Sequence, residues 1–490
     1  MYYIILSVFF PILAGTYLLV RKEMKTRRSL LVTTGVSLLV TAVLAVLALC
    51  LAGEGMLTLF NLTDRLPVLF KVDGVSVIFS AMTVIVFVCA GFFSFEYMKH
   101  EQKEKRYYGF YLIVFGVLLA LCFAGNLITF YLFFELLTLS SMPLVLHNGS
   151  KEAIMAGLKY LFYSLCGAYL SLFGLYFIES YGNTLTFSPG GVLSAGAIAE
   201  HGTVLLVTAM LMLIGFGVKA GMFPLHAWLP TAHPVAPAPA SAVLSAVIVK
   251  AGVLGMVRVV YYIFGVSFLR GSWVQTVWMC LTLLTVFIGS MLAYREPVLK
   301  KRLAYSTVSQ LSYILFGLSI METDALRGGL LHVLSHGFIK AALFLCAGAI
   351  IFKTGKTRVE ELRGIGKEMP LLMWCYTIVS LGLIGIPPTG GFISKWYLAE
   401  GALSSGIAVF SWLGPVILLI SALLTAGYLL PVTIRGFFPG ADYNYEALVK
   451  KEPSPLMTVP VLILALLSVL LGLLPGEILD YLLQIAGKVL

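Results

Sequence analysis

The chain has 490 residues, of which 60% are hydrophobic and only 11% carry a charged side chain. Soluble domains carry about 25% charged residues, so the composition excludes a soluble fold and predicts an all-α protein that crosses a membrane many times. The net charge of +10 gathers in short loops between apolar runs, so it reports topology and no nucleic-acid partner is expected.

Apolar runs of roughly 20 residues are long enough to cross a bilayer as a helix, and they predict about fourteen membrane-spanning helices. Their approximate limits are 2–20, 29–52, 74–95, 107–125, 126–147, 155–180, 201–230, 239–264, 272–294, 303–320, 326–352, 370–400, 407–437 and 456–485. Between two of these spans, the segment NTLTFSPGG at 183–191 predicts a short hairpin outside the membrane.

The distribution of basic residues predicts the orientation of the chain. Loops on the side of the cluster RKEMKTRR (21–28) hold 23 of the 33 Lys and Arg residues, whereas loops on the opposite side hold 5. Cytoplasmic loops are enriched in Lys and Arg, so we expect both termini outside. The basic cluster follows the first apolar run, which predicts a retained helix rather than a cleaved signal peptide.

Two opposite charges lie deep within predicted spans. Glu135 lies near the middle of the run 126–148, and Lys219 lies a few residues before Pro224. A charge at the centre of a membrane helix costs about 2.5–3.5 kcal/mol, so it usually has a partner and a function. A static ion pair is the alternative for these two alone, but later spans contain a further set of ionisable residues, namely Lys250, His332, His336, Lys340 and Lys395. This row predicts a protein that moves protons or small cations.

His332, His336 and Lys340 recur every fourth residue, so they share one helix face. Such a series, bridged by water, suits proton hopping, although His332 alone could equally be a hydrogen-bonded core histidine. A metal site is the competing interpretation of His-x-x-x-His, but no Cys or carboxylate accompanies it. The seven cysteines lie in apolar runs without C-x-x-C spacing, and no phosphate-binding loop follows a predicted strand. We therefore expect no metal, redox or nucleotide cofactor.

Proline and glycine interrupt two spans, each beside a lysine. We expect breaks around 222–224, next to Lys219, and around 387–391, next to Lys395. Broken helices at corresponding positions of two halves indicate inverted repeats with a site at their interface. His226 and His233 flank the cytoplasmic end of the first break and are either a channel entrance or loop histidines.

The segments FFELLTLSSMPL, KAGMFPLHAWLPTAHPVAPAPASAVLSAVIVKAG, LAYSTVSQLSYILFG, HVLSHGFIKAALFLCAG and GIPPTGGFISKW carry a resemblance over about 126–400. They are similar to the antiporter-like membrane subunits shared by respiratory complex I, Mrp-type Na⁺/H⁺ antiporters and membrane-bound nickel–iron hydrogenases. The resemblance implies fourteen helices with two inverted five-helix repeats. It divides the chain into 1–106, a first repeat at 107–264, a second repeat at 265–437, and a loop with the last helix at 438–490.

The resemblance also implies roles for the buried residues. Glu135 and Lys219 would form the charge pair of a first half-channel, Lys250 a central relay, and Lys395 the end of a second half-channel, with His332, His336 and Lys340 as the link. The chain would be a subunit of a larger prokaryotic plasma-membrane complex that moves H⁺, alone or in exchange for Na⁺. Its partners would be other membrane subunits, including paralogues, a redox module and lipid. A stand-alone transporter for a small solute and a non-conducting structural subunit are the alternatives.

Overall fold

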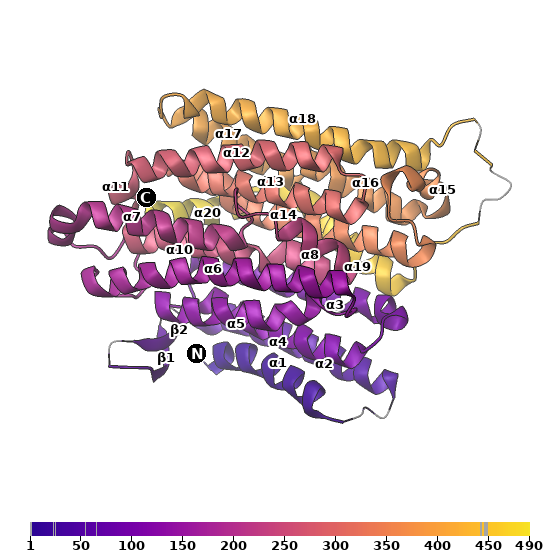
Figure 1. Ribbon diagram of the computed structural model, residues 1–490, viewed down its shortest axis with the longest axis horizontal. Helices are drawn as coiled ribbons and strands as arrows, with labels where there is room; N and C mark the ends of the chain where they lie inside the picture. The colour runs from indigo at the N-terminus through magenta and orange to yellow at the C-terminus, as the bar shows by residue number, and fades with distance from the viewer. Residues whose placement is uncertain are drawn as a thin grey trace.

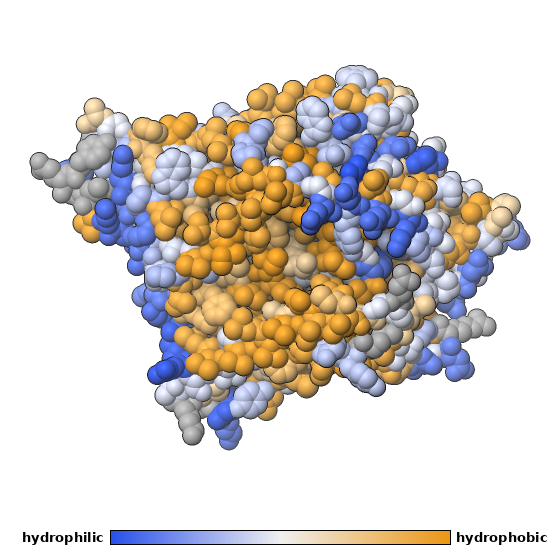
Figure 2. Space-filling view, turned by 180° about the vertical axis from the view of Figure 1, so that it is seen from behind, coloured by the Kyte–Doolittle hydropathy of each residue, from blue (hydrophilic) through white to orange (hydrophobic). Residues whose placement is uncertain are grey.

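The computed structural model describes residues 2–22, 24, 26–53, 55–64, 66–441, 443–444 and 449–490. Its helices run side by side along the long axis of the molecule, and both chain ends lie toward the same end of them as a small hairpin (Figure 1). Apolar side chains cover the middle of the surface, and hydrophilic side chains gather toward the two ends of the long axis (Figure 2). This banding is that of a multi-pass membrane protein whose helices cross the bilayer along the long axis.

The described residues from 2 to 219 form eight helical segments and one antiparallel hairpin. These are α1 (Tyr2–Val20), α2 (Arg27–Leu51), β1 (Met56–Asn61), β2 (Pro67–Lys71), α3 (Gly74–Tyr97), the short η1 (Met98–His100), α4 (Glu104–Phe123), α5 (Leu127–Val145), α6 (Lys151–Tyr181) and α7 (Ala195–Lys219). Strands β1 and β2 pair from Met56 opposite Lys71 to Asn61 opposite Pro67. The segment predicted as a hairpin, 183–191, is a loop whose ends pair through an isolated antiparallel bridge between Gly182 and Leu193, and a hairpin with two regular strands forms at 56–71.

In the described residues after α7, all regular elements are helical. These are α8 (Leu229–Val235), α9 (Ala238–Val243), the π-helical η2 (Leu244–Ile248), α10 (Lys250–Arg258), the π-helical η3 (Val259–Phe264), α11 (Val266–Leu269), α12 (Trp273–Arg295), α13 (Leu299–Ile320), α14 (Thr323–Thr354), η4 (Val359–Leu362), α15 (Ile365–Glu368), α16 (Pro370–Ile384), α17 (Gly390–Ser404), α18 (Phe410–Phe437), α19 (Pro455–Leu473) and α20 (Gly476–Val489).

Polar side chains set where many of the long helices begin. In six of them the residue before the first turn accepts a hydrogen bond from the backbone N–H three positions on, at Thr26, Asp73, Asn126, Ser150, Ser194 and Ser272. Such a side chain satisfies one of the N–H groups that have no partner within the helix. The apolar runs thus become helices with defined ends at the membrane surface.

The span count expected from the sequence is confirmed. Thirteen helical stretches in the described residues are long and apolar enough to cross a membrane, counting α9 to η3 as one stretch. The broken pair α16 and α17 covers the remaining predicted span at 370–400. The last span is itself divided, because α19 ends at Leu473 and α20 begins at Gly476.

Both predicted helix breaks are present. α7 ends at Lys219 and α8 begins only at Leu229, so the segment that contains Pro224 separates them. α16 ends at Ile384 and α17 begins at Gly390, so Pro387 and Pro388 lie between them. Proline has no N–H to donate and clashes with the preceding turn, which accounts for both interruptions.

The middle of the bundle is closed to lipid. The apolar window of the α9-to-η3 span is 100% buried inside the protein, and those of α13 and α14 are 94% buried. These three spans carry Lys250, Gln310, His332, His336 and Lys340. The ionisable side chains therefore face protein rather than hydrocarbon, as intramembrane charges do.

Candidate functional site

Lys219 lies at the end of α7 in a pocket of hydroxyl groups. Its side chain is buried, and its Nζ donates hydrogen bonds to Thr138 Oγ1 on α5 at 2.7 Å and to the Tyr160 hydroxyl on α6 at 2.8 Å. The Tyr160 hydroxyl also lies 2.8 Å from Ser141 Oγ, and the ring of Tyr160 has its centroid 4.8 Å from Nζ. Neutral acceptors and an aromatic face thus solvate this ammonium group.

Glu135 is half-buried on α5 and lies one helical turn before Thr138, the hydroxyl that binds Lys219. No ion pair within 4.0 Å joins Glu135 to Lys219, although both residues are described. The structure therefore places the two charges on neighbouring helices, with the Thr138 and Tyr160 hydroxyls as the direct partners of the lysine.

Lys250 is fully buried at the start of α10, directly after the π-helical η2. Its Nζ donates to the carbonyl of Ala246, which lies four residues earlier in η2. π-helical turns leave local carbonyls displaced from regular pairing and often mark functional sites. Because no acid pairs with Lys250 among the described residues, this carbonyl is its polar partner.

His332 connects α14 to two neighbouring helices. Its Nδ1 lies 2.8 Å from Ser394 Oγ on α17, and its Nε2 lies 3.1 Å from Gln310 Oε1 on α13. The ring of Tyr313 stacks against it with centroids 5.8 Å apart. His332 is thus a hydrogen-bonded histidine that joins three helices, and a relay through it would use Ser394 or Gln310.

Lys395 follows Ser394 on α17 and closes the second helix break. Its Nζ donates to the carbonyls of Leu383 at 2.6 Å and Ile384 at 3.0 Å, the last carbonyls of α16. The ammonium group also lies 4.8 Å from the centroid of Tyr313, whose other neighbour is His332. A cation at the C-terminal end of a helix is favoured by the carbonyls exposed there.

His336 is fully buried, and neither of its ring nitrogens has a hydrogen-bond partner among the described residues. Its ring centroid lies 5.9 Å from that of His332. Buried polar groups are nearly always hydrogen-bonded, so two unpaired nitrogens at one site indicate a position for water. A water molecule there would have His332 within reach on the same helix face.

Lys340 is fully buried one turn further along α14. Its Nζ donates to the carbonyl of Leu303 at 3.0 Å, and the same carbonyl accepts from Thr307 Oγ1 at 2.9 Å. Thr307 Oγ1 lies in turn 2.7 Å from Ser245 Oγ in η2. Lys340 is therefore joined to the segment that carries Lys250 by a short chain of hydroxyl and carbonyl groups.

Close helix packing joins the first lysine to the central one. A Cβ atom at Gly252 on α10 would lie 2.4 Å from the Phe216 carbonyl oxygen and 3.0 Å from Lys219 Cβ, so only glycine permits this approach of α7. On the other side, Gly337 of α14 faces Met82 and the Ala246 carbonyl. The structure thus brings the predicted row together as a sequence of neighbouring elements from α5 to α17.

His226 and His233 lie apart from each other. His226 is half-buried between α7 and α8, where it stacks on Phe223. His233 is fully buried, its ring nitrogens have no hydrogen-bond partner among the described residues, and its ring stacks on Phe344 at 4.7 Å. Phe344 is one turn from Lys340 on α14, so His233 reaches the row and His226 does not.

A small polar pocket lies beside His233. It has a volume of about 220 Å³, and its lining includes Glu101, Pro234 and Lys300. Lys300 Nζ donates to the Pro234 carbonyl at 3.2 Å and to the Ala236 carbonyl at 2.5 Å, which ties α13 to the end of α8. Burial raises the pKa of the Glu101 carboxyl above its usual value, and the charge of Lys300 partly opposes this effect.

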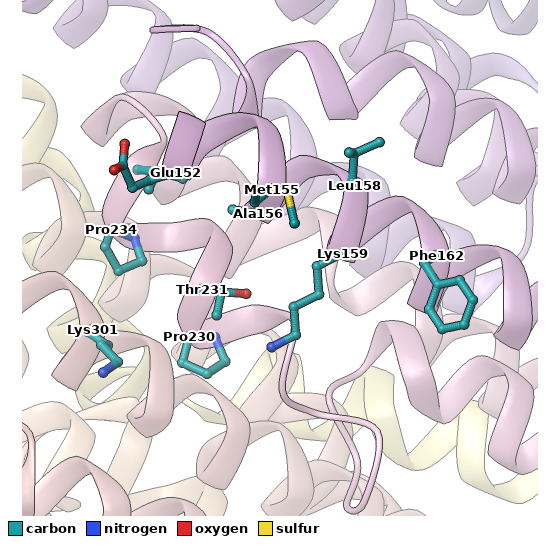
Figure 3. A pocket seen from close by; sticks show the side chains of 11 residues that line it. Glu152, Met155, Ala156, Leu158, Lys159, Phe162, Pro230, Thr231, Pro234 and Lys301 are labelled. Atoms are coloured by element: carbon teal, nitrogen blue, oxygen red, sulfur yellow. The ribbon is translucent and has the colours of Figure 1, made fainter. Parts of the chain in front are cut away.

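A second pocket of about 610 Å³ opens on the flank of the molecule between α6 and α8. Lys159 of α6 extends toward Pro230 of α8, and Lys301 lies on the far side (Figure 3). Exposed apolar side chains such as Met155 and Phe162 form much of its wall. None of the buried ionisable residues lines it, so this pocket does not belong to the row.

Sequence reasoning missed the neutral members of the site. These are Thr138, Ser141, Tyr160, Ser245, Thr307, Gln310, Tyr313 and Ser394. Several of them lie in the motif segments quoted above, but a single Ser, Thr or Tyr in an apolar span is common. Their signal would have been their helical spacing from the charged residues, for example Thr138 and Ser141 after Glu135.

Comparisons with known proteins agree with this fold. The profile described as "NADH:quinone oxidoreductase/Mrp antiporter, TM" matches residues 124–425, and that of "NADH-Ubiquinone oxidoreductase (complex I), chain 5 N-terminus" matches residues 61–108. NADH-quinone oxidoreductase subunit N of Desulforudis audaxviator is 32% identical over 396 residues, which are 79% of this chain and 77% of that protein.

Two further comparisons cover nearly the whole chain. A relative from Alkalihalophilus pseudofirmus, named as a subunit of an Na(+)/H(+) antiporter, is 28% identical over 488 residues, which are 99% of this chain and 97% of that protein. A chain in the structure of the Mrp complex from Dietzia sp. DQ12-45-1b has the same fold, with a TM-score of 0.85 at 22% sequence identity, and the match covers 99% of this chain and 97% of that chain. The chain therefore belongs to the family of antiporter-like transmembrane subunits that NADH:quinone oxidoreductases and Mrp antiporters share.

Proposed function

We propose that this chain moves protons through the membrane as one subunit of a larger complex. The observation that carries the proposal is the row of buried ionisable side chains, which neighbouring helices connect from Lys219 through Lys250 and His336 to Lys395. Its lysines bind hydroxyl groups and carbonyls, and no ion pair joins two members of the row among the described residues. A structural ion-pair network would instead pair each charge with its opposite.

The energy scale of the row fits this task. Moving one charge across about 180 mV costs about 4 kcal/mol. Forming or breaking one ion pair at 4 Å changes the energy by a similar amount, about 4 kcal/mol at an effective dielectric constant of 20. Pairing Lys219 with Glu135 in one state and with Thr138 and Tyr160 in another would therefore supply a switch of the required size.

Each group has a role that follows from its surroundings. Glu135 and Lys219 form the switch of the first half, and Lys250 is the central relay. His332, His336 and Lys340 link it onward with the help of bound water. Lys395 ends the row at the second break. There its ammonium group can move between the carbonyls of α16 and the face of Tyr313, which lies beside His332.

The cytoplasmic entrance lies at the pocket of Glu101 and Lys300. His233 stands between this pocket and Lys340, and its ring nitrogens have no partner in the described part of the chain, so it can pass a proton inward through water. His226 has no such connection and remains a loop histidine in this proposal. Both chain termini would then lie outside the plasma membrane of a prokaryotic cell, opposite the basic loops.

The two broken spans support a division of the chain into inverted repeats at 107–264 and 265–437. Lys219 lies at the end of the helix before the first break, and Lys395 lies in the helix after the second. Broken helices of this kind place ion sites at the interface of two repeats. Residues 1–106 and 438–490 would flank the pair.

The relatives suggest the partners and the ions. One relative is named as a subunit of an NADH-quinone oxidoreductase and another as a subunit of an Na(+)/H(+) antiporter. We propose that other membrane subunits, paralogues among them, surround this chain and that a redox partner drives it. H⁺ is the ion of the row, and Na⁺ is the ion that it would exchange.

The direct test replaces Lys250 with methionine in the native complex, which is then placed in lipid vesicles. Lys353→Met is the matched control, because it removes the same charge from an exposed position at the end of α14. We expect K353M to move protons at the wild-type rate under an imposed gradient and K250M to lose most of this activity. Equal rates in the two variants would show that the row does not conduct.

A further inference from the structure

A pocket at the end of the molecule that carries the chain termini opens onto a buried ion pair that the row does not use. The pocket has a volume of about 290 Å³ and lies between the start of α3, Tyr262 and one face of α20. Asp73 lines it, and Arg258 lies behind Asp73 with only 1% of its surface exposed. Arg258 Nη2 donates to Asp73 Oδ1 at 2.9 Å, and a second hydrogen bond joins Nη1 to Oδ2.

The ion pair is enclosed by aromatic rings. The guanidinium carbon of Arg258 lies 5.0 Å from the centroid of Phe187 and 4.7 Å from that of Tyr262. Arg258 also donates from Nη2 to Ser76 Oγ at 3.2 Å. The rings cover Arg258, so Asp73 is the member of the pair that reaches the pocket. The pair therefore closes the inner end of the pocket.

A stripe of hydroxyl groups runs inward from this pair along one face of α3. Asp73, Ser76, Ser80 and Thr83 follow one another at intervals of three or four residues, so they lie in line. The hydroxyls of Ser80 and Thr83 donate to carbonyls of their own helix, which leaves their lone pairs free to accept. At 1.5 Å per residue the stripe descends roughly 15 Å, about half of a bilayer.

The inner end of the stripe lies at the depth where α3 packs against the helix that carries His336. Met82 precedes Thr83, lies on a different face of α3 and packs on Gly337 of α14. A Cβ atom added at Gly337 would lie 2.5 Å from the Met82 sulfur and 3.7 Å from the Ala246 carbonyl oxygen. Gly337 follows His336, and the Ala246 carbonyl binds Lys250. The inner end of the stripe is therefore level with His336 and with the Ala246 carbonyl, and Arg258 at its outer end lies about two turns from Lys250 along α10.

Aromatic rings close the same face of α3 below that point. Phe87 stacks on Phe115 with centroids 4.8 Å apart and interplanar angle 7°, and it also contacts Tyr111 at 5.0 Å. Polar groups thus line the path from the pocket down to Thr83, and an apolar plug follows. This order, polar on one side and apolar beyond it, is the one expected of a half-channel whose outer end is closed by the ion pair.

We propose that the pocket, the Asp73–Arg258 pair and the hydroxyls of Ser76, Ser80 and Thr83 form a proton path from the outer surface to the row at Lys250 and His336. The inference rests on the proposed proton transfer along the row. Lys71 and Lys488 flank the pocket and repel metal cations, whereas a proton can pass along hydroxyls and water. The ion pair acts as the gate, since it must open before water can join the pocket to the stripe.

The first test compares two variants of the whole complex in vesicles. Ser80→Ala with Thr83→Val removes two hydroxyls of the stripe, and Ser94→Ala removes an equally buried hydroxyl of α3 beyond the aromatic plug. We expect the double variant to move protons about tenfold more slowly, which corresponds to about 1.4 kcal/mol in the barrier. We expect S94A to stay at the wild-type rate.

Glu135→Gln separates the failure of this inference from that of the proposed function. Wild-type rates in the S80A/T83V variant together with an inactive E135Q variant would overturn the path and leave the row intact. Wild-type rates in both S80A/T83V and E135Q would show that the row carries no protons, which would also exclude the proposed path.

Asp73→Asn tests the gate by a second readout. Asparagine also caps a helix, so this change keeps the start of α3 and removes the charge that holds Arg258. In vesicles without any driving reaction, we expect an imposed pH gradient to decay several times faster than with the wild-type complex. A lower melting temperature with an unchanged rate of decay would show that the pair is only a structural link.

Discussion

Glu135 and Lys219 illustrate how a buried charge can be held ready without an ion pair. Lys219 donates to two hydroxyls, one of which lies a single turn from Glu135. Hydrogen bonds to neutral hydroxyls are weaker than those to a carboxylate, so the lysine can leave them when the acid moves closer. The position of the proton then depends on which partners Lys219 has.

The first prediction at the residue scale is the effect of Glu135→Gln. The change keeps the size of the side chain and removes its charge, so the switch loses one of its two states. We expect the complex to assemble, to keep its partner's activity in part, and to move few ions in vesicles. Glu152→Gln, which removes an exposed acid at the start of α6, is the control and should have no effect. Proton movement by E135Q at the wild-type rate would make Glu135 a structural acid.

His147 gives a prediction for the pH dependence of stability. Burial, with the nearby charge of Arg106, lowers the pKa of this histidine from 6.5 to about 4. The unfolded chain therefore binds more protons between these values, and the free energy of unfolding falls as pH drops from 6.5 toward 4. We expect the melting temperature of the detergent-solubilised protein to fall in this window by the equivalent of roughly 1 kcal/mol or more. His147→Gln should reduce the change of melting temperature with pH in this window. An unaltered slope in this variant would show that other groups cause the pH dependence.

At the residue scale the sequence identifies charged groups better than their partners. A lysine or glutamate within an apolar span stands out because its insertion is expensive. The hydroxyls that bind Lys219 and His332 do not stand out, since Ser and Thr can satisfy themselves against their own helix. Asp73 and Arg258 are 185 residues apart in the chain, and only the fold shows that they meet.

At the scale of elements, the breaks were predictable and the segments around them less so. Proline and glycine mark the interruptions after Lys219 and before Lys395, because their backbone effects are local. The hairpin at 56–71 and the division of the last span into α19 and α20 depend on tertiary packing. A Cβ atom at Gly472 would lie 2.3 Å from the Pro388 carbonyl oxygen, so the end of α19 packs directly on the second break.

Gly391 gives the prediction for this scale. A Cβ atom there would lie 1.9 Å from the Gly382 carbonyl oxygen, so α16 and α17 pack backbone to backbone beside the break. We expect Gly391→Ala to force the two segments apart and to destabilise the protein by about 1–3 kcal/mol, measured by thermal unfolding. Gly202→Ala is the control, because nothing lies within 4 Å of its added Cβ atom and alanine favours a helix. Equal melting temperatures for G391A and the wild type would mean that the break can widen freely.

At the scale of the whole molecule, the number of spans follows from hydropathy, since every crossing needs about 20 apolar residues. The arrangement of the row does not follow in this way, because it depends on close approaches such as the one at Gly252. The distribution of Lys and Arg along the chain adds a prediction of the orientation. The loop 353–367 belongs to the basic side, whereas the β-hairpin lies toward the same end of the molecule as both termini (Figure 1).

This arrangement predicts which parts of the chain face the outside of the cell. If the basic loops stay in the cytoplasm, a peptide tag fused to either terminus will be cleaved by a protease added to intact spheroplasts. A tag inserted after Gly355, at the cytoplasmic end of α14, should be protected until the membrane is opened, because Gly355 ends that helix at the surface. The two sets of tags must behave oppositely, since both termini lie toward one end of the helices and α15, which follows the basic loop, lies toward the other (Figure 1). Protection of both termini in intact spheroplasts would show that the protein has the opposite orientation in the membrane. The pocket of Asp73 would then open toward the cytoplasm.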